Sequence, residues 1–284
     1  MASLKDLRNK IKSIKSIQQV TNAMKMVAAA KLRKSQDSME KARPYTGAIE
    51  DMINHLIPDI DRSILPILDS REFKKKLLVV VTADRGMAGA FNGNIIKKTE
   101  RLVKEFGNEK CTLICIGKKS HDHFKRRDYQ ILESYRDFWN SLNVSQAIKI
   151  GDYIVSKYLN KEFDVVDVIY NEFVSVASQK TVSKQLLPIE YHSDEETSSD
   201  VLYEPSKEEI VKTLIPKHLN IQIWQFLLES NASEQAARMV AMENATDNAG
   251  EMISDLSIEY NKARQAAITT EIIEIVSGAN ALEG

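Results

Sequence analysis

The sequence contains only two cysteines, Cys111 and Cys115, among its 284 residues. Both lie in one short apolar run, which provides neither a disulfide framework nor the paired spacing of a zinc site. Being four residues apart in an expected strand, they would share one face of a sheet and act as small core residues. We therefore expect a protein of a reducing compartment.

Long apolar runs are also missing, since no stretch of 18 or more apolar residues occurs. The first residues include Lys5, Asp6 and Arg8 with no apolar stretch, so we expect neither a transmembrane helix nor a secretory signal. Aromatic residues make up only 7% of the chain against 43% hydrophobic residues, which favours a helix-rich soluble protein over an aromatic β-sandwich. The expected location is the cytosol, or an organelle after processing.

An excess of either charge is absent as well. Lys and Arg total 39 against 40 Asp and Glu, for a formal net charge of -1. This balance argues against a nucleic-acid binder held by a cationic field over the whole protein. Any electrostatic effect must therefore be local.

Proline and glycine are unevenly distributed, and both are missing from the two ends of the chain. Neither occurs before Pro44, no proline follows Pro216, and the only later glycines are Gly250, Gly278 and Gly284. Residues 217–277 can therefore form one helix of roughly 90 Å, with Gly250 tolerated inside it. A helix of that length must pair with something along its length.

Both ends carry a heptad pattern, which is typical of a coiled coil. The expected seam of the C-terminal helix is Ala249, Ile253, Leu256, Tyr260, Ala263, Ala267 and Thr270. The expected seam of the N-terminal helix is Leu4, Leu7, Ile11, Ile14, Ile17, Val20, Met24 and Val27. The second pattern slips once near Ile17, as a stammer would make it.

The charges of the two ends are opposite. Residues 1–43 hold eleven basic and three acidic residues, a net of +8, whereas residues 217–284 hold four basic and ten acidic, a net of -6. We expect the two terminal helices to pack antiparallel along each other. The alternatives for the basic helix are a solvated face, a nucleic-acid arm or a membrane-surface helix, the last disfavoured by the absence of Trp and Phe.

The middle third has the composition of a small α/β sheet with about five strands. The expected elements are strands 76–82, 111–116, 129–135, 165–170 and 174–187, with helices 92–106 and 144–159. An exposed acidic loop, residues 193–200, closes the region.

Two segments suggest chemistry. In residues 82–94, Gly86, Gly89 and Gly93 fit neither G-x-G-x-x-G nor a Walker cradle, so we expect a tight turn stabilised by Asp84 and Arg85. His121, Asp122 and His123 stand among lysines and arginines that would repel a divalent cation, so we expect a solvated basic patch. No residue is predicted to be catalytic, cofactor-binding or metal-binding.

The two ends resemble the gamma subunit of the F-type ATP synthase. The resemblance is carried by residues 8–13 and 17–31 (IQQVTNAMKMVAAAK), by 237–248 (ARMVAMENATDN) and 260–279 (YNKARQAAITTEIIEIVSGA), and by Tyr203-Glu-Pro205. Residues 86–92 read GMAGAFN where the family commonly has GLCGGLN, so the cysteine of that loop is absent. The regulatory dithiol insertion of chloroplast members is missing too.

The resemblance implies a Rossmann-like α/β head and a long antiparallel coiled coil of the N- and C-terminal helices. The implied divisions are residues 1–72, 73–205 and 206–284. The implied function is that of a non-catalytic central stalk, one copy per complex, which transmits rotation in proton-driven ATP synthesis. Its partners would be the ring of alpha and beta subunits, the epsilon subunit and the membrane c-ring, without nucleic acid or cofactor. It would be a peripheral protein on the cytoplasmic face of a bacterial inner membrane, or on the matrix side in mitochondria.

The resemblance also implies contacts with the catalytic subunits. The implied contact residues are Met24, Arg238, Arg264, Gln265, Thr269 and Glu271. Ile268, Ile272, Ile273, Ile275 and Val276 would supply an apolar tip that turns in an apolar sleeve. The alternatives are a Rossmann-like nucleotide-dependent enzyme with helical extensions, and a nucleic-acid-binding coiled coil. The first lacks a phosphate fingerprint, and the positive charge that the second needs is cancelled by the C-terminal helix.

Overall fold

The computed structural model describes residues 3–56, 66–68, 71–137, 139, 142–189, 204 and 206–283. The chain forms two compact units. Residues 1–27 with 239–284 form the helix-pair unit, and residues 28–238 form the head unit. The acidic loop predicted at residues 193–200 lies outside the described residues, and the three sequence divisions at 72 and 205 stay a prediction.

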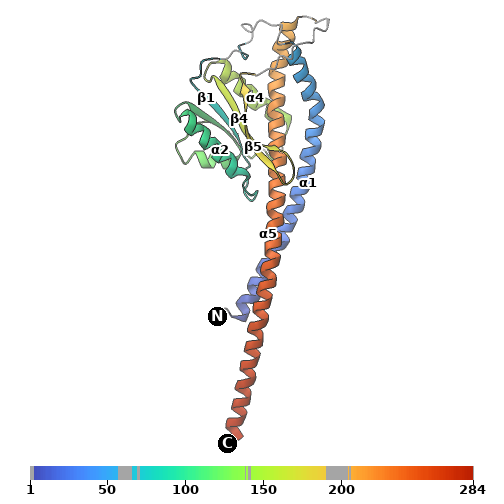
Figure 1. Ribbon diagram of the computed structural model, residues 1–284, viewed down its shortest axis with the longest axis vertical. Helices are drawn as coiled ribbons and strands as arrows, with labels where there is room; N and C mark the ends of the chain where they lie inside the picture. The colour runs from blue at the N-terminus through green and yellow to red at the C-terminus, as the bar shows by residue number, and fades with distance from the viewer. Residues whose placement is uncertain are drawn as a thin grey trace. The chain divides into compact units, whose positions relative to one another are not determined.

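The helix-pair unit contains the first turns of α1 (Leu4–Leu56) and the second half of α5 (Lys207–Glu283). The two segments lie side by side and run antiparallel, as Figure 1 shows. On α5, Ala249 and Leu256 are buried, and Ile253, Tyr260, Ala263 and Ala267 are half-buried. The predicted seam is therefore confirmed as far as Ala267, whereas Thr270 is exposed.

The seam predicted for α1 is wrong at three positions after Ile14, although Met24 is half-buried. Ile17, Val20 and Val27 are exposed by more than half of their surface. The helix instead turns Gln18, Thr21, Lys25 and Ala28 inward, so the heptad spacing of four and three continues without a stammer. The sequence prediction followed the apolar residues, but three of these inward positions are polar.

Hydrogen bonds across the helix pair explain why polar residues occupy the seam. The hydroxyls of Thr21 and Thr246 are 2.8 Å apart, and the Gln18 amide donates to the Thr246 carbonyl at 3.5 Å. Lys25 Nζ pairs with Glu243 Oε1 at 2.8 Å, and this hydrogen bond raises the pKa of Lys25. These bonds satisfy polar groups that would otherwise lose water on pairing. The predicted match of opposite charges thus includes at least this pair.

The head unit contains one five-stranded sheet, as the sequence predicted. The strand order is β3-β2-β1-β4-β5, with the first four strands parallel and β5 antiparallel to β4. The strands are β1 (Lys76–Val81), β2 (Cys111–Ile116), β3 (Ile131–Tyr135), β4 (Val165–Phe173) and β5 (Gln179–Leu187). The helices between them are α2 (Phe91–Phe106), α3 (Lys118–Phe124) and α4 (Val144–Leu159), of which α3 was not predicted.

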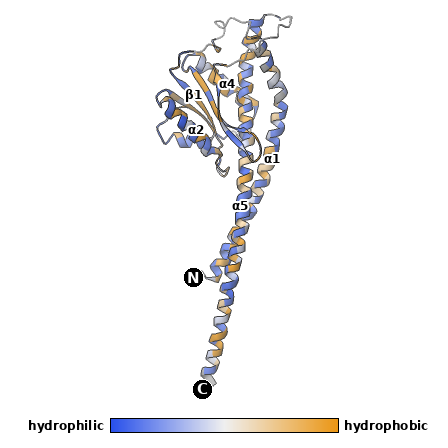
Figure 2. Cartoon of the chain, viewed as in Figure 1, coloured by the Kyte–Doolittle hydropathy of each residue, from blue (hydrophilic) through white to orange (hydrophobic). Residues whose placement is uncertain are grey.

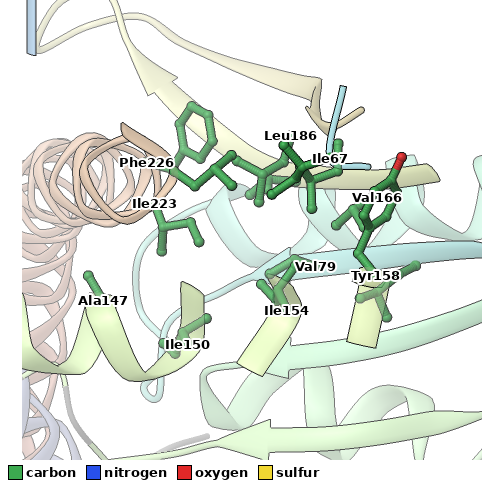
Figure 3. Close-up of a cluster of buried hydrophobic side chains, with 14 of the residues drawn as sticks. Ile67, Val79, Ala147, Ile150, Ile154, Tyr158, Val166, Leu186, Ile223 and Phe226 are labelled. Atoms are coloured by element: carbon green, nitrogen blue, oxygen red, sulfur yellow. The ribbon is translucent and has the colours of Figure 1, made fainter. Parts of the chain in front are cut away.

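The two faces of the sheet have separate apolar clusters. One face packs on α2 and α3 through Ile95 and Phe124, and it includes both cysteines, which are buried as predicted. Burial raises the pKa of Cys115 to about 12, so this thiol is unreactive near neutral pH. The other face packs on α4 and on the first half of α5; Ile150, Ile154, Ile223 and Phe226 meet the strands there (Figure 3).

Both long helices continue through a proline at which the sequence predicted a boundary. Pro44 lies inside α1, which continues to Leu56, and Pro216 lies inside α5, which begins at Lys207. A proline in a helix interior costs about 3 kcal/mol. Packing against the sheet offsets this cost, because the flanking turns bury apolar side chains. These are Ile49, Ile53 and Leu56 on α1, and Val211, Ile215 and Leu219 on α5.

Hydropathy follows this packing, since apolar residues are concentrated in β1 whereas α5 alternates between apolar and polar along its length (Figure 2). In the described parts of the chain, no helix contains a segment long and apolar enough to cross a membrane.

The seam predicts that an Asp substitution disrupts the helix pair at one position of α5 and leaves it intact at another. Leu256→Asp should place an unpaired carboxylate in the seam and separate the two helices of the helix-pair unit. Met252, one turn earlier, is 56% exposed, so Met252→Asp should leave the pair intact. Hydrogen exchange of residues 4–27 measures the outcome. Equal protection in both variants would contradict the assigned seam.

Candidate interaction surface

The end of α5 exposes a row of large apolar side chains. Ile268, Ile272, Ile273, Ile275 and Val276 are all exposed, with Ile275 at 71%. The seam against α1 ends at Ala267, so in the helix-pair unit this stretch continues as one helix without a paired helix among the described residues. Exposed apolar residues gathered in one place are typical of a protein–protein interface.

Four of the predicted contact residues lie on the same part of α5. Arg264, Gln265, Thr269 and Glu271 are all exposed, and they lie off the seam. The Thr269 hydroxyl donates to the Gln265 carbonyl at 2.9 Å, one turn back along the helix. Because the Arg264, Gln265 and Glu271 side chains are exposed and lie off the seam, they are accessible to a partner.

Sequence reasoning missed a second apolar surface on α1. Ile17, Val20 and Val27, together with Met26, are exposed on the helix-pair unit. Met24, the predicted contact residue on this helix, is half-buried beside them. The sequence does contain a signal for this surface. If the heptad spacing is kept regular, Gln18 and Thr21 lie in the seam, and Ile17 and Val20 lie outside it.

Arg238 lies in the head unit, apart from the other predicted contact residues. Its guanidinium pairs with the Glu234 carboxylate one turn earlier on α5 and donates to the Gly86 carbonyl at 3.0 Å. Its side chain is only 12% exposed. Burial raises the pKa of Glu234, and the charge of Arg238 opposes that shift. In this structure, Arg238 ties α5 to the loop that follows β1.

That loop, residues 82–90, is a tight turn as the sequence predicted. Gly89 has φ +53°, and Met87 has φ 62° and is 61% exposed. The Asn92 side chain accepts from the Ala83 N–H at 2.9 Å, which closes the turn. Asp84 accepts from the Lys118 N–H at 2.9 Å, so it does support the turn, by binding the first residue of α3.

In the predicted basic patch, the two histidines His121 and His123 have acidic partners, whereas the basic residues after them are solvated. His123 Nε2 lies 2.7 Å from Glu100 Oε1, and His121 Nδ1 lies 3.3 Å from Asp122 Oδ1. The basic residues 125–127 that follow α3 are exposed. Within the ranges that the structure describes, no group of three or more His, Cys, Asp or Glu side chains could hold a metal ion.

Comparison with known proteins matches the whole chain. The family model described as ATP synthase matches residues 3–282. The ATP synthase gamma chain of Prosthecochloris aestuarii (strain DSM 271 / SK 413) is 50% identical over 291 residues, covering 100% of both chains. That of Chloroherpeton thalassium (strain ATCC 35110 / GB-78) is 46% identical over 301 residues, covering 100% of this chain and 99% of the relative.

Two solved structures are similar. A chain of the Tetrahymena thermophila mitochondrial ATP synthase, central stalk and c-ring, has a TM-score of 0.62 and 27% identity over 80% of this chain and 99% of its own. A chain of the Euglena gracilis mitochondrial ATP synthase in rotational state 3 has a TM-score of 0.70 over 98% of this chain and 94% of its own. The second, at 23% identity, supports the fold alone.

The buried pair of Glu234 and Arg238 predicts a pH-dependent defect. Arg238→Met should destabilise the head unit by about 3 kcal/mol, because it leaves a buried carboxylate unpaired. The pKa of Glu234 should then rise further, so the variant should lose stability as pH rises through that pKa, since the folded state must release a proton that the unfolded state has already lost.

Both tryptophans, Trp139 and Trp224, belong to the head unit, so their fluorescence during urea unfolding measures its stability. The double variant Arg238→Met with Glu234→Gln should lose the added pH dependence. An unchanged slope in the double variant would show that another group titrates.

Proposed function

We propose, since the chain belongs to the ATP synthase gamma-chain family, that it is the central-stalk rotor which transmits rotation between a membrane c-ring and the catalytic ring of alpha and beta subunits. The observation that carries this proposal is the end of α5, a 77-residue helix whose last turns expose an apolar row. An isolated soluble chain gains nothing from such a row, whereas an element that turns inside an apolar sleeve requires one.

The proposed partners follow from the family and from the assemblies to which the structural neighbours belong. The Tetrahymena chain belongs to a central stalk with a c-ring. We assign to this chain the alpha and beta subunits, the epsilon subunit and the c-ring as partners, with one copy per complex. We also propose a peripheral position on the cytoplasmic face of a bacterial inner membrane, because the relatives named above are bacterial.

Packing and surface chemistry suit a shaft. Over the helix-pair unit, the seam from Ala249 to Ala267 and the polar bonds at Thr246 join two helices, and two joined helices resist bending and twisting more than one. Beyond the seam the large exposed apolar side chains are Ile and Val, whose contacts with a sleeve are non-directional. A shaft end that must pass through several angular positions needs contacts of this kind, because strong directional bonds would hold it at one angle.

A few polar contacts can favour particular angles. Arg264 and Gln265 are exposed next to the apolar row and are available to a catalytic subunit. We propose that they, with Met24, Thr269 and Glu271, contact that ring, and that Arg238 acts at the loop after β1. A contact made at only one angular position stabilises that position relative to the others, and so changes the rate of rotation.

The chain itself is proposed to be non-catalytic. The loop after β1 lies where a phosphate-binding loop would lie, but its glycine spacing differs from that of such a loop. Two of its backbone groups already have side-chain partners, since the Ala83 N–H donates to Asn92 and the Gly86 carbonyl accepts from Arg238. The alternative of a Rossmann-like nucleotide-dependent enzyme is favoured by no observation in the described residues.

The isolated chain is therefore expected to bind neither ATP nor NAD and to hydrolyse no ATP. Isothermal titration calorimetry and a phosphate-release assay measure this. The same preparation, added to alpha and beta subunits, should join a large complex that hydrolyses ATP. Micromolar binding of either nucleotide to the isolated chain would revive the enzyme alternative.

Replacing Arg264 and Gln265 by Ala should leave assembly intact but change ATP turnover of the complex several-fold. Neither residue lies in the seam, so the fold should not depend on them, and a charged hydrogen bond contributes about 1.5–3 kcal/mol where it forms. Lys97→Ala with Asn94→Ala is a matched control, because these residues are likewise one base and one amide, exposed on α2. If turnover equals that of the control, the two residues are only solvated.

A further inference from the structure

Basic side chains are concentrated on the outer surface of α2 and α3 in the head unit. Between residues 98 and 127 the sequence has nine Lys and Arg against four Asp and Glu, a net of +5, whereas the rest of the chain has a net of -6. Eight of these nine basic side chains are exposed, and together they form what we call the basic face. The charge balance of the whole chain therefore hides a strongly positive local surface.

The two helices that carry the basic face form one layer. Ile95 of α2 and Phe124 of α3 pack on the same face of the sheet, and His123 Nε2 of α3 lies 2.7 Å from Glu100 Oε1 of α2. The opposite face of the sheet packs on α4 and on the first half of α5, so α2 lies on the side of the sheet away from that half of α5 (Figure 1). The basic face is thus directed away from the packed elements of the head unit.

Carboxylates of the same layer do little to offset its charge. Glu100 is held by His123, and Asp122 Oδ1 lies 3.3 Å from His121 Nδ1, so two of the four acidic residues pair with histidines. Within the part of the chain that the structure describes, no ion pair joins a side chain of the basic face to a carboxylate. Like charges gathered in this way repel one another, and an anionic partner would relieve that repulsion.

The composition of the basic face favours lipid headgroups as that partner. Among residues 88–137, all of which the structure describes, no large apolar side chain is exposed, so the face lacks the apolar anchors of a protein interface. It also lacks an exposed aromatic ring on which single-stranded nucleic acid could stack. Five of the eight exposed bases are lysines, which bind as point charges without the fixed geometry of arginine pairs. A layer of anionic headgroups requires neither an anchor nor a fixed geometry.

We propose that the basic face binds the anionic headgroups of a lipid bilayer. The choice of a bilayer over duplex nucleic acid rests on the proposed function, which places the chain beside a membrane c-ring. At about 0.1 M salt the attraction extends over roughly 10 Å, so the face does not have to touch every headgroup. Such a contact has no fixed register along the bilayer, and it is therefore compatible with rotation of the chain.

The test is sedimentation of the full chain with lipid vesicles. Vesicles of equal parts phosphatidylglycerol and phosphatidylcholine should carry the chain into the pellet, whereas vesicles of phosphatidylcholine alone should leave it in the supernatant. Raising the salt concentration from about 0.1 M to about 1 M should release the chain, because the screening length falls from ~10 Å to ~3 Å. Absence of binding to the anionic vesicles, equal binding to both kinds, or binding that persists at the higher salt would overturn the proposal.

Two double variants locate the binding on the basic face. Arg101→Gln with Lys104→Gln acts on α2, and Lys125→Gln with Arg126→Gln acts just after α3. All four side chains are exposed, so the fold should be retained. Each variant removes one Arg and one Lys, and each should weaken binding to the anionic vesicles about tenfold or more.

The matched control removes the same two charges from the helix-pair unit. Lys5→Gln with Arg8→Gln replaces one Lys and one Arg that are exposed on α1. This variant should bind the anionic vesicles as the parent does, because the helix-pair unit has eight basic against nine acidic residues and hence no positive excess. If the control loses as much binding as the other two variants, the vesicles do not bind at the basic face and the proposal is wrong.

Two further results separate this proposal from its alternatives. A short DNA duplex added at about 0.15 M salt should not displace the chain from the anionic vesicles, and displacement would assign the face to nucleic acid instead. A chain that joins an ATP-hydrolysing complex with alpha and beta subunits but binds no anionic vesicles would overturn this proposal alone. A chain that binds the vesicles but joins no such complex would overturn the rotor proposal and leave the lipid-binding face in place.

Discussion

Packing along α5 is the constraint on which both units of this protein depend. Over its first half, buried residues at spacings of four and three, from Val211 to Leu227, meet the sheet. Over its second half, a seam from Ala249 to Ala267 meets α1. One helix can serve two such different neighbours because its inward stripe changes from continuous bulky apolar residues to a seam in which three of the six residues are alanines. The same packing explains why α5 passes through Pro216, since buried turns flank the proline on both sides.

The exposed surface of the helix-pair unit depends on which residues of α1 lie in the seam and which lie outside it. Apolar Ile17, Val20 and Val27 are outside, whereas polar Gln18 and Thr21 are inside, where they bond to Thr246. A purely apolar seam would be tighter but would tolerate sliding by one turn, because apolar contacts are not directional. Hydrogen bonds between particular partners fix the register, as single polar positions do in coiled coils. The exposed apolar residues are thereby left available to a partner, which agrees with the proposed function of a shaft.

Two buried carboxylates of α5 show how differently such groups can be accommodated. Glu234 is paired with Arg238, which also reaches the Gly86 carbonyl, so its charge contributes to joining the helix to the loop after β1. Glu229, little more than one turn earlier, accepts from the Gln225 amide and interacts with the Tyr170 hydroxyl, so its partners are neutral. A buried charge is tolerated only when it is bonded. Both carboxylates therefore keep partners from the fold itself, a cation for the first and neutral donors for the second.

Sequence alone determined the elements whose signals are local. Alternating heptads, the lack of proline after Pro216 and short apolar runs such as 111–116 predicted the long helices, the strands and the seam of α5, because each depends on neighbouring residues. Arg264 and Gln265 were predicted as contact residues from a family resemblance, and both are exposed, as the proposed role requires. Tertiary structure decided what depends on distant partners. Thr21 lies in the seam because Thr246 faces it, Arg238 is tied to Gly86 rather than exposed, and α1 continues beyond Pro44 because Ile49, Ile53 and Leu56 find a sheet to cover. None of these partners is near in sequence, so no local pattern could have indicated them.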